Sequence, residues 1–198
     1  MTDTDYYRTH YAEYHDKTFR IDPAIFLSGF VKHLRPGAHL IDIGCGSGRD
    51  LRWLKEKGFL VTGFDASAGM ADLARRHARC PVIEGDLETF DFKTLVVDAV
   101  LMSGSLVHLP HNRLAPALAN ILKALRKGPD ARVYLSLKEG KGVFNHTHHR
   151  AYYLWQDQEI RSIIAGLGLR VLDVARSDSA RGTGAIWLGC ILAWEMDS

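Results

Sequence analysis

The chain has 198 residues, 46% of them hydrophobic and 24% charged, a composition that fits one globular domain and excludes a disordered or fibrous protein. Its 25 Lys and Arg face 23 Asp and Glu, a formal net charge of +2 that lacks the basic excess of a dedicated nucleic-acid binder. Three scattered cysteines (Cys45, Cys80 and Cys190), an acidic N-terminus and the lack of any apolar run of roughly 20 residues predict a cytoplasmic protein with reduced thiols, no signal peptide and no membrane span.

The predicted elements alternate between short apolar strands and amphipathic helices. Tyrosines at helical spacing within residues 1–20 predict one amphipathic N-terminal helix. Asp22 and Pro23 then form the cap and first turn of a helix that runs to about Leu34. Further strands are expected at 39–43, 60–64, 82–84, 96–102, 132–137, 170–175 and 186–193, and further helices at 49–57, 69–78, 113–126 and 157–166.

This alternation predicts an α/β fold, a Rossmann-like doubly wound sheet of seven strands with helices on both faces. The sheet is mostly parallel, because each strand is followed by a helix that can cross over. The last two strands are the exception: residues 176–185 between them show no helical pattern, so an antiparallel last strand is expected. We expect one domain, with residues 1–35 as an N-terminal helical cap on a core of residues 36–198.

A glycine-rich turn follows the first strand of the core and opens a helix. Gly44, Gly46 and Gly48 lie in this turn, at the strand end where an open parallel sheet binds its ligands. Asp65 ends the second strand about 20 residues later, where an acid can bind both hydroxyls of a ribose. Asp86 follows the third strand and can accept from an adenine amino group. The turn alone could be purely structural, but the three elements in this order predict a nucleoside site.

The glycine spacing separates two kinds of nucleoside cofactor. The dinucleotide fingerprint G-x-G-x-x-G requires glycine at position 49 or 51, where Arg49 and Leu51 stand. The actual pattern closely resembles motif I of class I S-adenosylmethionine-dependent methyltransferases. Further segments match that family in order: Asp42-x-Gly44-x-Gly46-x-Gly48, Asp65, Asp86-Leu87, Val97-Asp98-Ala99-Val100 and Leu125-Arg126-Lys127-Gly128-Pro129. The resemblance runs from about residue 36 to the C-terminus and implies S-adenosylmethionine as the cofactor.

Nearly the whole chain resembles a narrower group, the small bacterial methyltransferases related to the tellurite-resistance type. In that group the fifth strand usually ends in a lysine with a following glycine, which matches Lys138 and Gly140. An arginine usually precedes the last strand, and Arg181 is its counterpart, although the usual Arg-Pro-Gly is here Arg-Gly-Thr. The other segments that carry this likeness are the aromatic N-terminus, Gly46-Ser47-Gly48-Arg49-Asp50, Ser105-Leu106-Val107-His108-Leu109-Pro110 and Trp187-Leu188.

The resemblance implies a set of cofactor-binding residues. Asp65 is expected on the ribose, Asp86 on the adenine, and Arg49 near the methionyl carboxylate. Structural roles stay open for several of them: Asp42 can hold the turn, and Arg49 can be a solvated first-turn residue. The complete predicted set is Tyr14, Asp42, Gly44, Cys45, Gly46, Gly48, Arg49, Asp65, Ala66, Met70, Asp86, Leu87 and Ser103.

His108 is the candidate catalytic base, because it follows the fourth strand, where the acceptor should lie. A base is needed only if the acceptor loses a proton, and a His that merely lines the pocket is the alternative. Lys138, Arg181 and Trp187 are expected to bind the acceptor, and two cations with an aromatic face suit a small anionic or planar molecule. The run 146–149 contains three histidines, but one short loop cannot bring three rings onto one ion, so no metal is expected.

The predicted function is therefore methyl transfer to a small-molecule acceptor by direct displacement. An RNA methyltransferase is the first alternative, and it predicts a continuous basic surface with steeply salt-dependent binding. A non-catalytic S-adenosylmethionine binder is the second.

Overall fold

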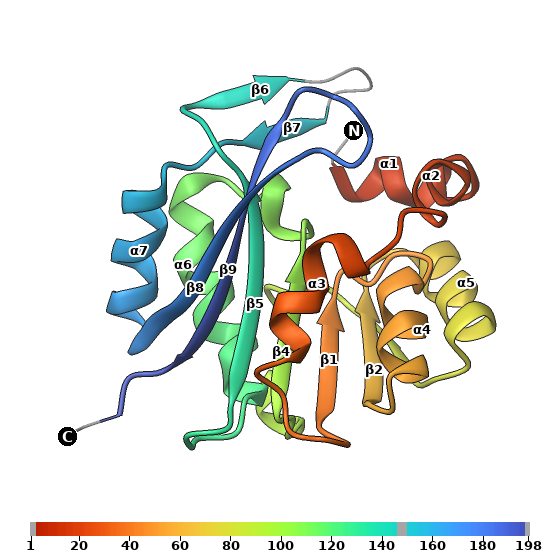
Figure 1. Cartoon of the computed structure of the whole chain (residues 1–198). Helices are drawn as coiled ribbons and strands as arrows, with labels where there is room; N and C mark the ends of the chain where they lie inside the picture. Colours follow the sequence, from red (N-terminus) through yellow and green to blue (C-terminus); the bar gives the residue numbers. More distant parts are fainter. Residues whose placement is uncertain (1–2, 146–149, 197–198) are drawn as a thin grey trace.

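The computed structural model describes residues 3–145 and 150–196, and these form a central sheet with helices on both faces (Figure 1). The strand order is β3-β2-β1-β4-β5-β9-β8, and the first five of these pair in parallel, whereas β9 pairs antiparallel with both β5 and β8. This confirms the predicted Rossmann-like fold. The strands are β1 (His39–Ile43), β2 (Leu60–Asp65), β3 (Val82–Glu84), β4 (Ala99–Ser103), β5 (Arg132–Lys138), β8 (Leu169–Asp178) and β9 (Ile186–Trp194).

Two separate hydrophobic cores hold the helices to the two faces of the sheet. Successive residues of a strand point to opposite faces, so Leu40 packs in one core and its neighbour Ile41 in the other. The core around Leu40 takes residues from α3, α4 and α5, and the core around Ile41 takes residues from α6 and α7. These helices are α3 (Ala24–Val31), α4 (Arg49–Glu56), α5 (Ala68–Ala78), α6 (His111–Ile121) and α7 (Asp157–Gly166).

The N-terminal segment contains two helices, so the prediction of a single helix over residues 1–20 was wrong. They are α1 (Asp3–Thr9) and α2 (Tyr11–Thr18), and the chain turns between them at His10. The turn is stabilised locally, because the Thr9 hydroxyl donates to the Tyr6 carbonyl and the His10 ring stacks on the Tyr6 ring. Both helices pack against α5, at the edge of the sheet where β1 and β2 end (Figure 1).

The predicted helix over 113–126 was also misplaced at both ends. Helix α6 begins at His111, directly after Pro110, and the residues after Ile121 tighten into a short 3-10 turn, η3 (Leu122–Ala124). The turn ends there because Leu125 is extended and forms a bridge with Val97. Strand β4 begins at Ala99 and not at the predicted residue 96, and Val97 pairs only in this isolated bridge.

A small hairpin that the sequence pattern did not predict lies over the same edge of the sheet as α1 and α2 (Figure 1). It pairs β6 (Val143–Asn145) with β7 (Ala151–Tyr153). The three histidines of residues 146–149 lie outside the described residues. Within residues 3–145 and 150–196, no three His, Cys, Asp or Glu side chains are grouped as a metal site requires. No helix in this described part has the length and apolar character to cross a membrane.

Candidate active site

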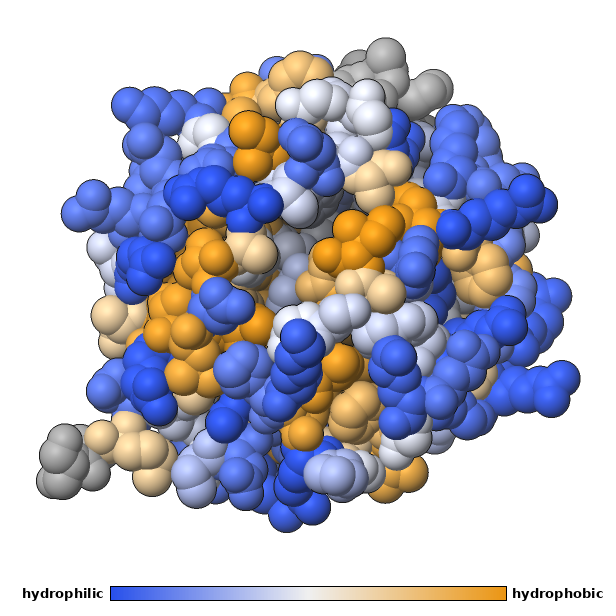
Figure 2. Space-filling view, viewed as in Figure 1, coloured by the Kyte–Doolittle hydropathy of each residue, from blue (hydrophilic) through white to orange (hydrophobic). Residues whose placement is uncertain are grey.

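Two adjoining cavities lie at the edge where the parallel strands end. The larger has a volume of about 530 Å³ and lies between the glycine-rich turn and the N-terminal helices. The smaller, of about 270 Å³, lies between α3 and the β8–β9 hairpin. Figure 2 shows this side of the molecule hollowed between the apolar surface over α3 and that over β8 and β9. Tyr14, Ser103 and Gly104 line both cavities, so the two spaces meet at these residues.

Asp65 stands in the wall of the larger cavity, at the end of β2. One carboxylate oxygen accepts from the Gly46 N–H at 2.8 Å and the other from the Ser67 N–H at 2.9 Å. Burial raises the pKa of Asp65, and these two backbone donors oppose the rise because they favour the ionised form. The carboxylate is thus held in a fixed orientation and retains lone pairs for a further donor.

Two glycines of the turn are required for different reasons. Gly46 has φ of +54° and a side chain at its position would meet no atom within 4 Å, so the backbone here faces the open cavity. Gly48 has φ of +84°, and a side chain there would lie 2.8 Å from the Cα of Ala74. Gly48 therefore allows α4 to pack closely on α5, and it does not line either cavity.

Three ionisable residues, Asp42, Asp50 and Arg49, lie close together beside the turn. Asp42 is 2% exposed, and burial together with the nearby Asp50 raises its pKa well above the usual range. Arg49 binds Asp50 through two nitrogens, at 2.6 and 3.0 Å, and its guanidinium lies 5.1 Å from the ring centre of Phe26. The charge of Arg49 is therefore already matched by Asp50, and Arg49 lines only the smaller cavity.

His108 lies in the wall of the larger cavity, on a short 3-10 turn, η2 (Leu106–His108), after β4. Its Nδ1 is 2.7 Å from the carbonyl oxygen of Ala151, which can only accept, so Nδ1 carries the proton. Its Nε2 is then the acceptor for the hydroxyl of Tyr7, 3.0 Å away. Burial raises the pKa of Tyr7 well above its usual range, so this phenol is neutral and donates.

The floor of the smaller cavity is the sheet itself. Ser136 of β5, Gly189 of β9 and Ala175 of β8 are paired across the strands and so share one face. One pair further along this face, Lys138 stands opposite Trp187. The Trp187 ring reaches to within 3.1 Å of where a side chain of Gly104 would lie, so it abuts the junction of the two cavities.

Most of the predicted site residues are brought together by the fold. The larger cavity is lined by Tyr14, Gly44, Gly46, Asp65, Ala66, Met70, Asp86, Leu87, Ser103 and His108. The smaller cavity is lined by Tyr14, Arg49, Ser103, Arg181 and Trp187. Neither cavity is lined by Asp42, Cys45, Gly48 or Lys138.

Three residues of this region were not among the predicted site residues. Tyr7 contacts His108 from α1, and the only signal for it was the aromatic N-terminus. Tyr152 packs on the His108 ring with ring centres 4.7 Å apart, and Arg150 forms a hydrogen bond with Tyr7. Both belong to the segment of the β6–β7 hairpin, which carried no strand pattern in the sequence.

Comparison with known sequences identifies a domain family and two relatives that this chain resembles. Residues 40–128 match a family described as a methyltransferase domain. A malonyl-[acyl-carrier protein] O-methyltransferase of Serratia marcescens is 36% identical over 94 residues, which cover 47% of this chain and 36% of the relative. A ubiquinone biosynthesis O-methyltransferase of Coxiella burnetii is 28% identical over 155 residues, covering 70% of this chain and 66% of the relative. The chain thus spans about a third of the first relative and just under two thirds of the second.

Solved structures share the fold over almost the whole chain. A 1,6-didemethyltoxoflavin-N1-methyltransferase of Burkholderia thailandensis, with bound 1,6-didemethyltoxoflavin and S-adenosylhomocysteine, has a TM-score of 0.75 at 24% identity, over 96% of this chain and 85% of that one. A TehB-like S-adenosylmethionine-dependent methyltransferase of Corynebacterium glutamicum has a TM-score of 0.70 at 21% identity, over 94% of this chain and 98% of that one.

Residues 40–128 thus match a methyltransferase domain, and the glycine motif and the sheet topology are those of the class I S-adenosylmethionine-dependent methyltransferases. A TehB-like methyltransferase is among its structural neighbours, and at 21% identity this likeness shows a shared fold. S-adenosylmethionine is the cofactor of this class.

Proposed function

We propose that the protein transfers the methyl group of S-adenosylmethionine to a small-molecule acceptor. The observation that carries the proposal is the meeting of two cavities at Tyr14, Ser103 and Gly104, since a direct displacement needs cofactor and acceptor in contact. A small molecule is favoured over RNA because the second cavity holds only about 270 Å³ and the formal net charge is only +2. The cytoplasm stays the proposed compartment, on the argument from the thiols.

The residues of the larger cavity fit the cofactor. The open backbone at Gly46 leaves room beside the turn, and the Asp65 carboxylate is oriented to accept from two ribose hydroxyls. Asp86 lines the same cavity and supplies an acceptor for the adenine amino group. When bound, the cofactor supplies an activated methyl group: its S–CH₃ bond breaks as the bond to the acceptor forms, and S-adenosylhomocysteine leaves.

The Tyr7–His108 pair is the proposed route for the acceptor's proton. The Tyr7 hydroxyl lies on Nε2 of His108, so an acceptor proton can pass to the Tyr7 oxygen as the phenol proton moves to Nε2. The Ala151 carbonyl stabilises the protonated ring, because it accepts from Nδ1–H. Nearby Arg150, which hydrogen-bonds Tyr7, stabilises negative charge on the phenol oxygen during the transfer.

Calorimetry with S-adenosylhomocysteine tests the cofactor site. We expect micromolar binding by the natural protein and at least tenfold weaker binding by Asp65→Ala, since a hydrogen bond to a charged group contributes about 1.5–3 kcal/mol. Asp91→Ala is the matched control, because Asp91 also accepts from the N–H two residues ahead of it but lies outside both cavities. An unchanged dissociation constant for Asp65→Ala would remove Asp65 from the site, and equal affinity for NAD would overturn the cofactor assignment.

A further inference from the structure

Three cationic side chains from separate segments gather beside the junction of the two cavities. Lys138 ends β5, Arg150 precedes β7, and Arg181 lies in the turn between β8 and β9. Burial, followed by the charges of Arg181 and Arg150, lowers the pKa of Lys138 to about 8. Lys138 therefore lies close enough to both guanidinium groups to be repelled by them.

Aromatic rings pack against two of these cations, Lys138 and Arg150. The Lys138 Nζ lies 3.4 Å from the ring centre of Tyr152 and 5.6 Å from that of Trp187. The Arg150 guanidinium, in a side chain that is 4% exposed overall, lies 4.0 Å from the ring centre of Tyr6. The face of a ring attracts a cation through its quadrupole, yet it brings no negative charge.

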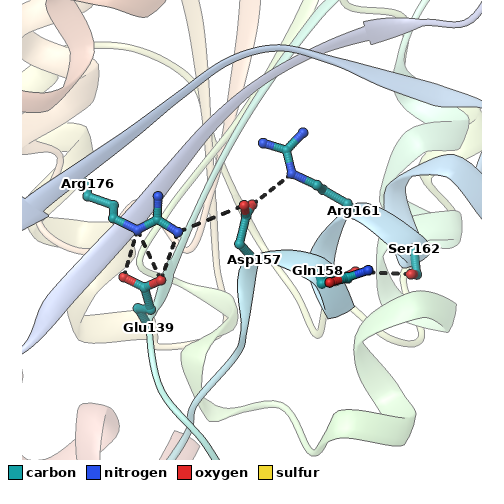
Figure 3. A network of polar contacts seen from close by, with 6 residues as sticks. All are labelled: Glu139, Asp157, Gln158, Arg161, Ser162 and Arg176. Atoms are coloured by element: carbon teal, nitrogen blue, oxygen red, sulfur yellow. Dashed lines mark hydrogen bonds and ion pairs between the residues drawn. The ribbon is translucent and has the colours of Figure 1, made fainter.

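The nearby carboxylates, those of Glu139 and Asp157, pair with an arginine on the opposite side of β5 from Lys138. Within the described residues, no Asp or Glu forms an ion pair with Lys138 or Arg181. The next residue along, Glu139, binds Arg176 at 3.0 Å through both of its oxygens, and Arg176 also approaches Asp157 at 3.8 Å (Figure 3). Arg176 is thus paired with carboxylates, whereas the positive charges of Lys138 and Arg181 remain beside the cavities.

This excess of positive charge lies where an acceptor has to bind. Arg181 and Trp187 line the smaller cavity, and Trp187 abuts Gly104 at the junction. Tyr152, which packs against Lys138, also packs against His108 in the wall of the larger cavity. Arg181, Trp187 and the candidate base therefore line the two joined cavities, and Lys138 adjoins this space through its contacts with Tyr152 and Trp187.

We propose that the methyl acceptor is a small planar molecule that carries a carboxylate or similar anionic group. Its ring stacks on Trp187, and its anion binds Lys138 and Arg181. This inference rests on the proposed function and narrows its acceptor to one chemical class. A planar anion supplies the missing countercharge and also the flat surface that the aromatic wall accommodates.

The test compares carboxylates with their uncharged carboxamides, which have nearly the same shape. Benzoate, 4-hydroxybenzoate and 2-naphthoate are each titrated beside the matching amide into protein loaded with S-adenosylhomocysteine, by calorimetry. We expect at least one carboxylate to bind about tenfold or more tightly than its amide, as charge-assisted hydrogen bonds allow. We expect Lys138→Met and Arg181→Met to remove that preference. Arg181 is exposed, so its replacement leaves the fold intact. Arg176→Met is the matched control and should leave the preference unchanged.

Two results overturn the inference: no carboxylate binds better than its amide, or the preference survives in both Lys138→Met and Arg181→Met. Binding of S-adenosylhomocysteine is measured first, so that a failure of the proposed function can be distinguished from a failure of the proposed acceptor class. If the protein binds S-adenosylhomocysteine but shows no preference for anions, only the acceptor class is wrong. If it does not bind S-adenosylhomocysteine, the proposed function is wrong, and the preference for carboxylates can still be measured on the protein alone.

Discussion

Lys138 and Glu139 are neighbours in the chain, yet they belong to opposite electrostatic environments. Glu139 joins a network in which two carboxylates, its own and that of Asp157, face two arginines, Arg176 and Arg161 (Figure 3). Lys138 joins cations and aromatic rings instead. Side chains alternate between faces along a strand, so one step along the backbone separates a balanced set of charges from an unbalanced one.

The charges around Lys138 are better candidates for ligand binding than the charges around Glu139. The arginines of the Arg176 network are exposed and its carboxylates are half-buried, and ion pairs in contact with solvent contribute little to stability. The Lys138 cluster is partly buried beside a cavity, where like charges cost free energy unless a ligand offsets them. Four predictions test whether the two environments differ in function.

The largest effect is expected at His108, whose ring packs on the same tyrosine as Lys138. His108→Ala should lower turnover by about 10²–10⁴-fold, the usual contribution of a general base, and leave S-adenosylhomocysteine affinity within about threefold. Tyr7→Phe keeps the ring, removes the relaying oxygen, and should also lower turnover. His111→Ala is the control, because His111 also bonds a backbone carbonyl but lines neither cavity. Full turnover by His108→Ala would mean that alignment alone suffices for transfer.

Reversing a charge on each side of the strand should give unequal losses. Lys138→Glu places a carboxylate against the acceptor's anion, a juxtaposition that costs several kcal/mol, so kcat/KM should fall roughly a hundredfold. Arg176→Glu reverses a charge of the balanced network and should leave kcat/KM nearly unchanged. Equal losses in steady-state kinetics would show that the two sides do not differ in function.

Anion binding should weaken as the pH rises through about 8. In the free protein Lys138 titrates near pH 8, and a bound anion favours its charged form and raises its pKa, so binding takes up a proton above that pH. The other charged groups around it are the guanidinium groups of Arg150 and Arg181, and burial raises the pKa of Tyr152 away from this range. Calorimetry between pH 6.5 and pH 9.5 (roughly 1.5 units either side of the transition) measures the slope. A slope that persists in Lys138→Met would assign it to another group.

The smallest effect is expected for Arg176→Met on stability. Both partners of the Arg176–Glu139 pair contact solvent, and water already screens the interaction. The melting temperature should therefore change by less than about 4 °C. A larger drop, measured by circular dichroism, would show that the network holds the β8–β9 hairpin in place and is not merely a surface feature.

The parts of the fold with strong local signals could be predicted from the sequence. The strands β1 and β3 have the expected bounds. A short apolar run bounded by glycine, proline and polar residues is compatible with few structures other than a strand. The turn after β1 could be predicted because closely spaced glycines favour a turn over a helix or a strand. The hairpin β6–β7 could not be predicted, because β6 is exposed along its whole length and shows no alternation of apolar and polar residues.

The residues of the candidate site also divide into those that could be predicted from the sequence and those that could not. Asp65 and Asp86 could be placed because strand ends converge at one edge of a parallel sheet. Arg150 and Tyr152 could not, since their contacts with Tyr7 and His108 join segments more than 40 residues apart in the chain. Arg49 could be placed at the turn, but its pairing with Asp50 depends on side-chain orientation, which no sequence spacing specifies.

Gly189 and Ala175, the small residues of the cavity floor, have a consequence for how such a protein can diversify. Neither residue lines the larger cavity, so larger side chains there would reduce the proposed acceptor cavity without displacing any group of the proposed cofactor cavity. Gly189 is the tighter of the two, because a side chain there would meet the Tyr134 hydroxyl at 2.8 Å, whereas Ala175 lies on the outer strand and is exposed. Under the proposed function, a lineage could therefore change acceptor size by single substitutions at Ala175 while keeping the larger cavity unaltered.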